Sequence, residues 1–210
     1  MQKNPYHGKF IVFDGLDGSG ISTQTAALVD YLNRPEQKLR YGHTGVYLTK
    51  EPTSGLIGGL IRSQLSHEWK SSPECLQLLF SADRAHHLEK GIIPLLEKGV
   101  TIICDRYFFS SIAYGSLEIK DKDWLVNLNK NFLLPDIAFF LRVSPKICIE
   151  RISKARHGFT LYEKEETLEK VWKNFENLAQ EFENIFILNG EQPVDKIDEE
   201  IREIVDKKLR

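Results

Sequence analysis

The stretch Gly15-Leu16-Asp17-Gly18-Ser19-Gly20-Ile21-Ser22-Thr23 decides the fold of this chain. It follows a short apolar run, Phe10 to Phe13, and precedes a helical pattern that begins at Thr23. A buried strand, a glycine-rich turn and a helix start are the context of the phosphate-binding motif G-x-x-x-x-G-K-[ST]. The stretch matches that motif at every specified position except the lysine, where Ile21 stands. The sequence therefore predicts a phosphate loop without its usual cation.

The chemistry of such a loop rests on its backbone. The glycines let N–H groups curl around phosphate oxygens, and the helix N-terminus adds a partial positive charge. The Ser22 hydroxyl is placed to reach a Mg²⁺ ion on the nucleotide. A lysine would also follow negative charge as it shifts during transfer, and its loss removes several kcal/mol of transition-state stabilisation by analogy with other preorganised groups. Taken alone, the loop argues for binding more strongly than for catalysis, and a glycine-rich turn that binds nothing stays an alternative. The candidate ATP-binding residues are Gly15, Asp17, Gly18, Ser19, Gly20, Ile21, Ser22 and Thr23.

Strand and helix patterns alternate along the rest of the chain. Apolar runs without alternation, typical of strands covered on both faces, follow at 45–49, 100–104, 137–143 and 185–188. Helical patterns lie at 23–32, 73–98 (broken near Gly91 and Pro94), 122–132, 145–156, 167–182 and 194–209. This order predicts an α/β fold, a three-layer P-loop NTPase fold with a five-stranded parallel sheet flanked by helices. We expect one kinase domain over residues 1–210.

Composition narrows the class of protein. The 210 residues are 41% hydrophobic and 28% charged, with 28 basic against 30 acidic side chains and a formal net charge of -2. This balance gives no electrostatic case for binding nucleic acid or a membrane. No apolar run approaches the roughly 18 residues of a membrane span, and no signal peptide opens the chain. Three cysteines in apolar surroundings, Cys75, Cys104 and Cys148, are expected to be buried thiols. We therefore expect a soluble, cytoplasmic protein.

Further segments, in order, resemble the thymidylate kinase family. Thr49-Lys50-Glu51-Pro52 resembles its Thr-Arg-Glu-Pro segment, and the stretch from Leu78 to Arg84 resembles Leu-Leu-Phe-Ala-Ala-Asp-Arg. Asp105-Arg106-Tyr107 matches Asp-Arg-Tyr, and the stretch from Ser110 to Tyr114 continues as Ser-[Ser/Thr]-x-Ala-Tyr. Together with the loop, these segments extend the resemblance over about residues 9 to 205, nearly the whole chain.

The resemblance implies the reaction ATP + dTMP → ADP + dTDP, with Mg²⁺, on a homodimeric α/β fold. Phe80 resembles the aromatic residue that stacks on thymine, and Arg84 the residue that hydrogen-bonds a thymine carbonyl. Ser111 resembles the hydroxyl residue at the base edge, and Tyr114 the ring beneath the deoxyribose, where it would collide with a 2′-hydroxyl. Arg106 resembles the guanidinium that binds the acceptor phosphate, for which its planar fork is suited.

The remaining roles concern the metal and the donor phosphates. Asp17 resembles the carboxylate near the acceptor's 3′-hydroxyl, while Asp105, after a buried strand beside the loop, and Ser22 are the candidate metal ligands. Arg151 and Arg156 resemble arginines of a lid at about residues 150–165 that closes on the ATP phosphates. The candidate catalytic residues are thus Arg106, Arg151, Arg156 and Asp105. Taken one at a time, these residues also have purely structural explanations. Phe80 could be a core residue, and Asp105 and Arg106 could form a surface ion pair.

Five departures from the family pattern cluster at the site, and two of them are Asp14 in place of a usual glutamate and Arg142 where the family often has aspartate. Ile21 replaces the loop lysine, Lys50 replaces an arginine near the acceptor phosphate, and Gly115 stands where bacterial members usually have glutamine. If the chain is a kinase, another cation must act for the lysine, and the candidates are Lys154, Arg151, Arg156 and Lys50. The alternatives are a nucleotide-binding pseudokinase, or a kinase for another nucleoside monophosphate such as dUMP, for which Gly115 leaves room.

Overall fold

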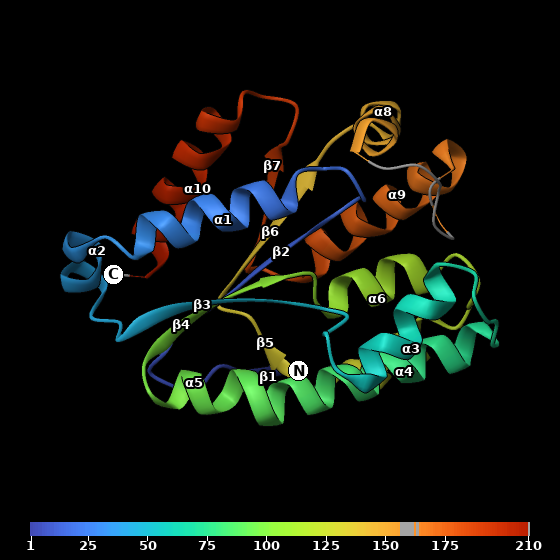
Figure 1. The fold of residues 1–210 in the computed structure, drawn as a ribbon, viewed down its shortest axis with the longest axis horizontal. Helices are drawn as coiled ribbons and strands as arrows, with labels where there is room; N and C mark the ends of the chain where they lie inside the picture. Colours follow the sequence, from blue (N-terminus) through green and yellow to red (C-terminus); the bar gives the residue numbers. More distant parts are fainter. Residues whose placement is uncertain (156–161, 163, 210) are drawn as a thin grey trace.

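A five-stranded parallel sheet in the order β3-β4-β2-β6-β7 forms the centre of the computed structural model (Figure 1). The strands are β2 (Phe10–Gly15), β3 (Gly45–Lys50), β4 (Val100–Asp105), β6 (Ile137–Arg142) and β7 (Ile185–Asn189). The structure describes residues 1–155, 162 and 164–209. The predicted strands and the fold class are confirmed.

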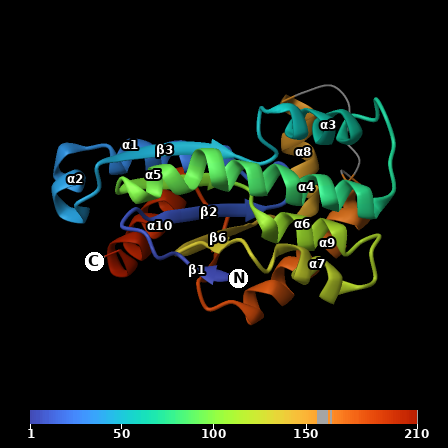
Figure 2. The ribbon, with the colours of Figure 1, turned by 90° about the horizontal axis from the view of Figure 1, so that it is seen from below.

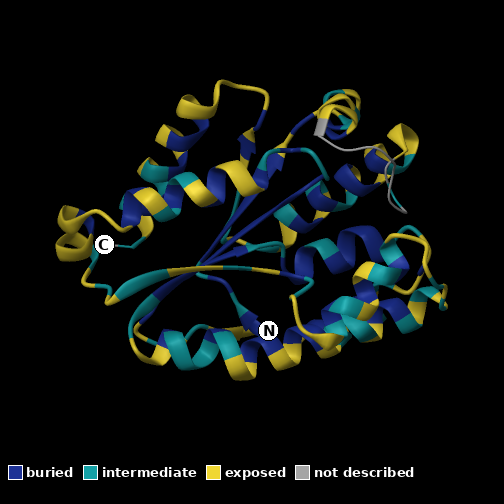
Figure 3. Cartoon of the chain, in the orientation of Figure 1, coloured by how far each residue is buried: buried dark blue, intermediate teal, exposed yellow. Residues whose placement is uncertain are grey.

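Helices cover both faces of this sheet because the central strands are apolar on both faces. In β2, Ile11 and Phe13 pack into one apolar layer beneath α1 (Ile21–Leu32) and α10 (Val194–Lys208), and Phe10 and Val12 into the other. The second layer lies beneath α5 (Ile93–Glu97), α6 (Phe108–Gly115) and α9 (Glu165–Glu181). Figure 3 shows the buried central strands between exposed helix surfaces. All six residues of β2 are buried.

The remaining elements surround these layers. The helices are α2 (Pro35–Tyr41), α3 (Leu56–Leu65), α4 (Pro73–His87), α7 (Lys122–Asn129) and α8 (Pro145–Ala155). A π-helical turn, Leu88–Ile92, joins α4 to α5, so the predicted break near Gly91 and Pro94 is confirmed. Figure 2 shows α5 and α4 running end to end along one side of the sheet. Two short strands, β1 (Gln2–Lys3) and β5 (Leu133–Leu134), pair in parallel outside the main sheet.

Three expectations from the sequence need correction. The strands β3 and β7 are not covered on both faces, because they are the edges of the sheet, and Tyr47, Leu48 and Ile187 are between 41% and 47% exposed. Cys75 is only half-buried because it lies in the first turn of α4, whereas Cys104 and Cys148 are buried. The helices α2, α3 and α6 have no counterpart among the predicted elements.

The sheet topology positions the site. The carboxyl ends of β2, β3 and β4 lie at one edge, since these strands are parallel and paired in register. The loop between β2 and α1 leaves the sheet at this edge, with β4 on one side and β6 on the other. In open α/β sheets ligands bind at the carboxyl ends of the strands. In the described part of the chain, no helix has the length and apolar character needed to span a membrane.

The close approach of the segment before β2 to β4 gives a stability test. A Cβ at Gly8 would lie 2.2 Å from the carbonyl oxygen of Val100, whereas a Cβ at Gly45 would meet nothing within 4 Å. We expect Gly8→Ala to lower the free energy of unfolding by about 1–3 kcal/mol, because the backbone must shift. Gly45→Ala is the matched control and should leave it nearly unchanged. Denaturant titration measures both, and equal effects of the two variants would contradict this packing.

Candidate functional site

The phosphate loop is held open by left-handed glycines. Gly18 and Gly20 have φ of 80° and 99°, a region that residues with a Cβ rarely adopt. Gly20 is the N-cap of α1, and its carbonyl oxygen accepts from the N–H of Thr23 at 3.1 Å. A Cβ at Gly18 would lie 2.6 Å from the carbonyl oxygen of Cys148, so the loop packs directly against α8. The loop therefore has the geometry that exposes backbone N–H groups to an anion.

Ile21 occupies the lysine position of the motif, at the first turn of α1. Its side chain is only 5% exposed and packs into the apolar layer between the sheet, α1 and α10. The residue also borders the cavity described below. The loop itself thus supplies backbone dipoles but no positively charged side chain.

A cation reaches the loop from α8 instead. The Arg151 guanidinium donates to the carbonyl oxygens of Gly18 at 3.4 Å and Ser19 at 3.3 Å through Nη1, and to that of Gly190 at 3.3 Å through Nη2. A Cβ at Gly20 would lie 4.0 Å from Nη1. These bonds are long, so the guanidinium can exchange them for stronger acceptors such as phosphate oxygens.

The other cations proposed to replace the lysine differ in position. Lys154 points to Glu150, with 3.3 Å between Nζ and Oε1, and is 73% exposed. Lys50 is exposed at the end of β3 and borders the cavity, with no contact to the loop among the described residues. Arg156 and most of the predicted lid lie outside the described residues. Of the described candidates, Arg151 is the one that contacts the loop.

A hydroxyl and a carboxylate meet beside the loop. Ser22 Oγ donates to Asp105 Oδ2 at 2.8 Å, joining the first turn of α1 to the end of β4. Both are hard oxygen donors of the kind that Mg²⁺ prefers, and neither is buried. Among the described residues, no group of three or more His, Cys, Asp or Glu could hold a metal ion. The pair therefore fits a Mg²⁺ ion that takes its other ligands from a nucleotide and water.

One cavity of about 940 Å³ joins these groups to the predicted acceptor residues. Of the predicted site residues, those that line it are Asp17, Gly18, Ser19, Gly20, Ile21, Ser22, Thr23, Lys50, Phe80, Arg84, Asp105, Arg106, Ser111, Tyr114 and Arg151. Gly15 lies just beneath, where its carbonyl oxygen accepts from Arg106 Nη1 at 2.8 Å. Predicted residues that lie up to 134 positions apart in the sequence, from Asp17 to Arg151, thus share one cavity.

Arg106 is fixed between the loop and α6. Its backbone has φ of 70°, its Nη2 pairs with Asp17 Oδ1 at 2.6 Å, and its Nη1 donates to Ser110 Oγ at 2.9 Å. Ser110 in turn donates to the buried carboxylate of Asp14. Burial raises the pKa of Asp14 to about 7, although the hydrogen bond from Ser110 and the charge of Arg106 oppose that shift. The Asp105-Arg106 stretch is therefore part of an internal network rather than a surface ion pair.

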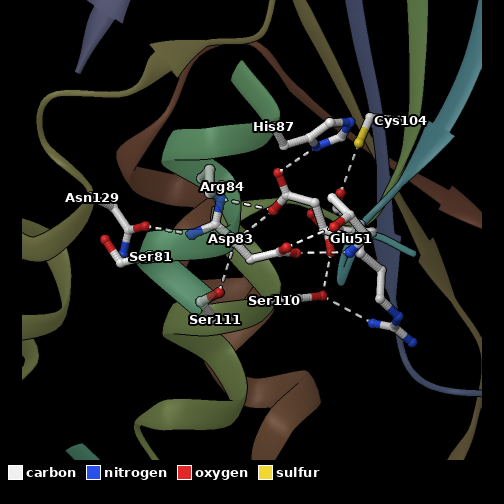
Figure 4. A network of polar contacts seen from close by, with 12 residues as sticks. Glu51, Ser81, Asp83, Arg84, His87, Cys104, Ser110, Ser111 and Asn129 are labelled. Atoms are coloured by element: carbon white, nitrogen blue, oxygen red, sulfur yellow. Dashed lines mark hydrogen bonds and ion pairs between the residues drawn. The ribbon is translucent and has the colours of Figure 1, made fainter. Parts of the chain in front are cut away.

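Arg84 is held by a buried network under the cavity (Figure 4). The Arg84 side chain is 1% exposed. Its Nε and Nη2 contact Glu51 Oε2 at 2.9 and 2.8 Å. Nη2 also donates to Ser111 Oγ at 3.0 Å, and Nη1 donates to Asn129 Oδ1 at 2.6 Å. Glu51 further contacts His87 Nδ1 at 3.1 Å. Arginine has five N–H groups, so these contacts leave one on Nη1. Removing one partner of such a buried pair is costly, which holds Arg84 in place.

The aromatic residues form the remaining walls. Phe80 is half-buried on α4 and borders the cavity, so it is not simply a core residue. The Tyr114 hydroxyl accepts from the Asp17 N–H at 3.3 Å, and its ring lies 5.3 Å from that of Tyr162. Tyr114 thus stands between the loop and the acceptor side, close to the predicted sugar position.

Several cavity or network residues were not predicted from the sequence. The sequence predicts no role for Glu51 beyond its place in the segment from Thr49 to Pro52. Its position before a proline at the end of a strand is the signal that could have identified it. Asn129 carries no such signal, because it binds Arg84 from 45 positions away. Gln77 and Arg62 line the cavity from helices α4 and α3.

The space beside Gly115 is not empty. A Cβ there would lie 3.0 Å from Cδ and Nε2 of Gln77 and 3.1 Å from Leu125 Cδ2. A side chain from α4 therefore occupies the room that Gly115 leaves, and a different acceptor nucleotide stays a prediction.

Comparison with known proteins agrees with this geometry. The thymidylate kinase family model matches residues 13–201. A probable thymidylate kinase of Pyrococcus horikoshii is 39% identical over 208 residues, covering 96% of this chain and 98% of the relative. A thymidylate kinase of Plasmodium falciparum is 38% identical over 182 residues, covering 86% of this chain and 82% of the relative. The structure of thymidylate kinase from Candida albicans superposes with a TM-score of 0.79 at 28% identity, covering 99% of this chain and 96% of that one. The resemblance seen in the motifs extends over nearly the whole chain and its fold, and the chain belongs to the thymidylate kinase family.

Proposed function

We propose that this chain transfers the γ-phosphoryl group of ATP to dTMP, giving ADP and dTDP. The observation that carries the proposal is the single cavity that joins a phosphate loop to the acceptor residues Phe80, Arg84, Arg106 and Tyr114. Phosphoryl transfer needs little covalent work from the protein, and its catalysis is mainly positioning and electrostatic stabilisation. The arrangement supports both requirements.

The acceptor side is organised around two arginines. Arg106, now paired with Asp17, would exchange that carboxylate for the acceptor phosphate, whose oxygens suit a planar guanidinium. Asp17 would then be free to accept from the 3′-hydroxyl of the deoxyribose. Phe80 offers a flat face to the base, and the remaining N–H of Arg84 can donate to a base carbonyl. The Tyr114 ring, held at the loop through Asp17, would collide with a 2′-hydroxyl on the acceptor sugar.

The donor side rests on the loop and on Arg151. Backbone N–H groups from Gly18 to Thr23 would bind the ATP phosphates, with the positive end of α1 behind them. Ser22 and Asp105 would hold Mg²⁺, which supplies neutralisation of phosphate charge. We further propose that Arg151 acts for the missing lysine, because its guanidinium already lies against the loop carbonyls of Gly18 and Ser19.

We also propose that the chain forms a homodimer, as its resemblance to the family implies. Exposed leucines on α3 and α4, Leu56, Leu60 and Leu78, agree with a homodimer that covers them. A single kinase domain over residues 1–210, a lid at about 150–165 and a cytoplasmic location stay predictions. The competing function, a pseudokinase that binds nucleotides without turnover, is favoured by Ile21 alone.

The first prediction concerns the reaction itself. We expect purified protein to form dTDP from Mg·ATP and dTMP, and chromatography measures the dTDP formed. Arg106→Ala should lower kcat/KM roughly 100-fold or more, since it removes a preorganised charge at the acceptor phosphate. Arg142→Ala is the matched control, because Arg142 is 64% exposed and pairs only loosely with Glu176 at 3.7 Å. Binding of both nucleotides without ADP formation would instead identify a pseudokinase.

The second prediction separates the candidate cations. Arg151→Gln should lower kcat about 10- to 100-fold and leave the KM for dTMP nearly unchanged, because the lost charge faces the donor phosphates. Lys154→Gln, from the same helix and lying one turn further on, should have little effect. Steady-state kinetics with ATP and dTMP varied in turn measure both. Equal activity of Arg151→Gln and the native chain would remove Arg151 from the mechanism.

A further inference from the structure

Gln77 shares one face of α4 with two predicted acceptor residues. Phe80 and Arg84 follow it by three and seven positions, so all three side chains lie on the same side of the helix. All three border the cavity. Gln77 is 4% exposed, which is unusual for a polar side chain of its length. Its position thus relates it to the acceptor side rather than to the surface.

The side-chain amide of Gln77 has no partner within the described part of the chain. Its neighbours on α4, Ser81 and Arg84, both donate hydrogen bonds. The polar atoms of the Gln77 amide are not fully enclosed by protein, and the side chain borders the cavity. A buried amide left without a partner costs about 1–3 kcal/mol. A ligand in the cavity could supply that partner.

Gly115 is what allows this position. A Cβ there would fall 3.0 Å from Cδ and Nε2 of Gln77, so any larger residue at this position would displace the amide. Nε2 is the polar atom nearer to Gly115, which directs Oε1 away from it.

Two polar groups at this end of the cavity can donate, whereas the carboxylate of Glu51 beside them is held by Arg84 and His87. Arg84 has one N–H left on Nη1, and Ser111 Oγ accepts from Arg84 Nη2, so its own hydrogen is free to donate. Both suit carbonyl oxygens. Arg84 offers no acceptor for an N–H group, and Ser111 Oγ already uses one lone pair on Arg84 Nη2. The carbonyl of Gln77 is an acceptor that has no partner within the described part of the chain.

We propose that Gln77 determines the specificity of this site for the base of the acceptor, an inference that rests on the proposed function. Thymine and uracil present an N–H between two carbonyls, and that N–H would donate to Gln77 Oε1 while the carbonyls accept from Arg84 and Ser111. Cytosine has an unprotonated ring nitrogen at the same place, which would oppose its lone pair to Oε1. Gln77 therefore selects dTMP and dUMP over dCMP.

Equilibrium binding tests this without requiring turnover. Calorimetric titration with dTMP, dUMP and dCMP, in the absence of ATP, compares the native chain with Gln77→Met, which keeps the length of the side chain and removes its amide. We expect Gln77→Met to weaken binding of dTMP and dUMP roughly 10-fold, about 1.4 kcal/mol, and to leave dCMP nearly unchanged. Gly115→Ala, which displaces the amide from the other side, should lower the same preference.

A matched control is the glutamine at position 37. Gln37 is 8% exposed on α2 and does not border the cavity, so Gln37→Met should leave all three affinities unchanged. Thermal unfolding verifies that each variant is folded. The inference is overturned if Gln77→Met and Gly115→Ala retain the native preference for dTMP over dCMP, or if all three affinities fall equally. If the native chain binds none of the three, the proposed function fails and the inference with it.

Discussion

The interaction on which this site depends is the contact between the phosphate loop and α8. Ile21 places an apolar side chain into the layer beneath α1, so the loop has no cation of its own. Gly18 packs against the carbonyl of Cys148, and this close approach lets Arg151 reach the carbonyls of Gly18 and Ser19. A charge that usually comes from inside the loop is thus available from the neighbouring helix. If α8 were farther from the loop, the described residues at the loop would offer the donor phosphates backbone dipoles but no positively charged side chain.

The acceptor side follows a different principle, in which buried charges hold one another. Glu51 positions Arg84 and is itself contacted by His87, and Asn129 takes a further N–H of the guanidinium. Such pairs add little to stability compared with apolar packing, but they hold a guanidinium in one orientation when every partner is satisfied. Arg106 is positioned less rigidly, by Asp17 and Ser110, and it is the arginine that we propose exchanges Asp17 for the acceptor phosphate.

Local sequence patterns predicted the parts of the fold that depend on local physics. The apolar runs predicted all five strands of the main sheet, and the glycines predicted the loop, because short apolar runs and left-handed turns leave direct signatures in the sequence. Exposure of Tyr47 and Leu48 in β3 was not predictable, since it follows from the edge position of that strand. The partners of Arg84 at Glu51 and Asn129 lie 33 and 45 positions away, and Gln77 fills the space at Gly115 from another helix. Such compensation between distant residues appears only when the chain is folded.

The most direct measurement of the central claim is a double-mutant cycle between positions 21 and 151, with kcat for dTDP formation as the readout. Ile21→Lys is made in the native chain and in Arg151→Gln. If Arg151 acts for the lysine, Ile21→Lys restores most of the activity lost in Arg151→Gln and adds little to the native chain, giving a coupling energy above about 1 kcal/mol. If the two effects are simply additive, the two side chains act independently, and the account of the loop given above is contradicted.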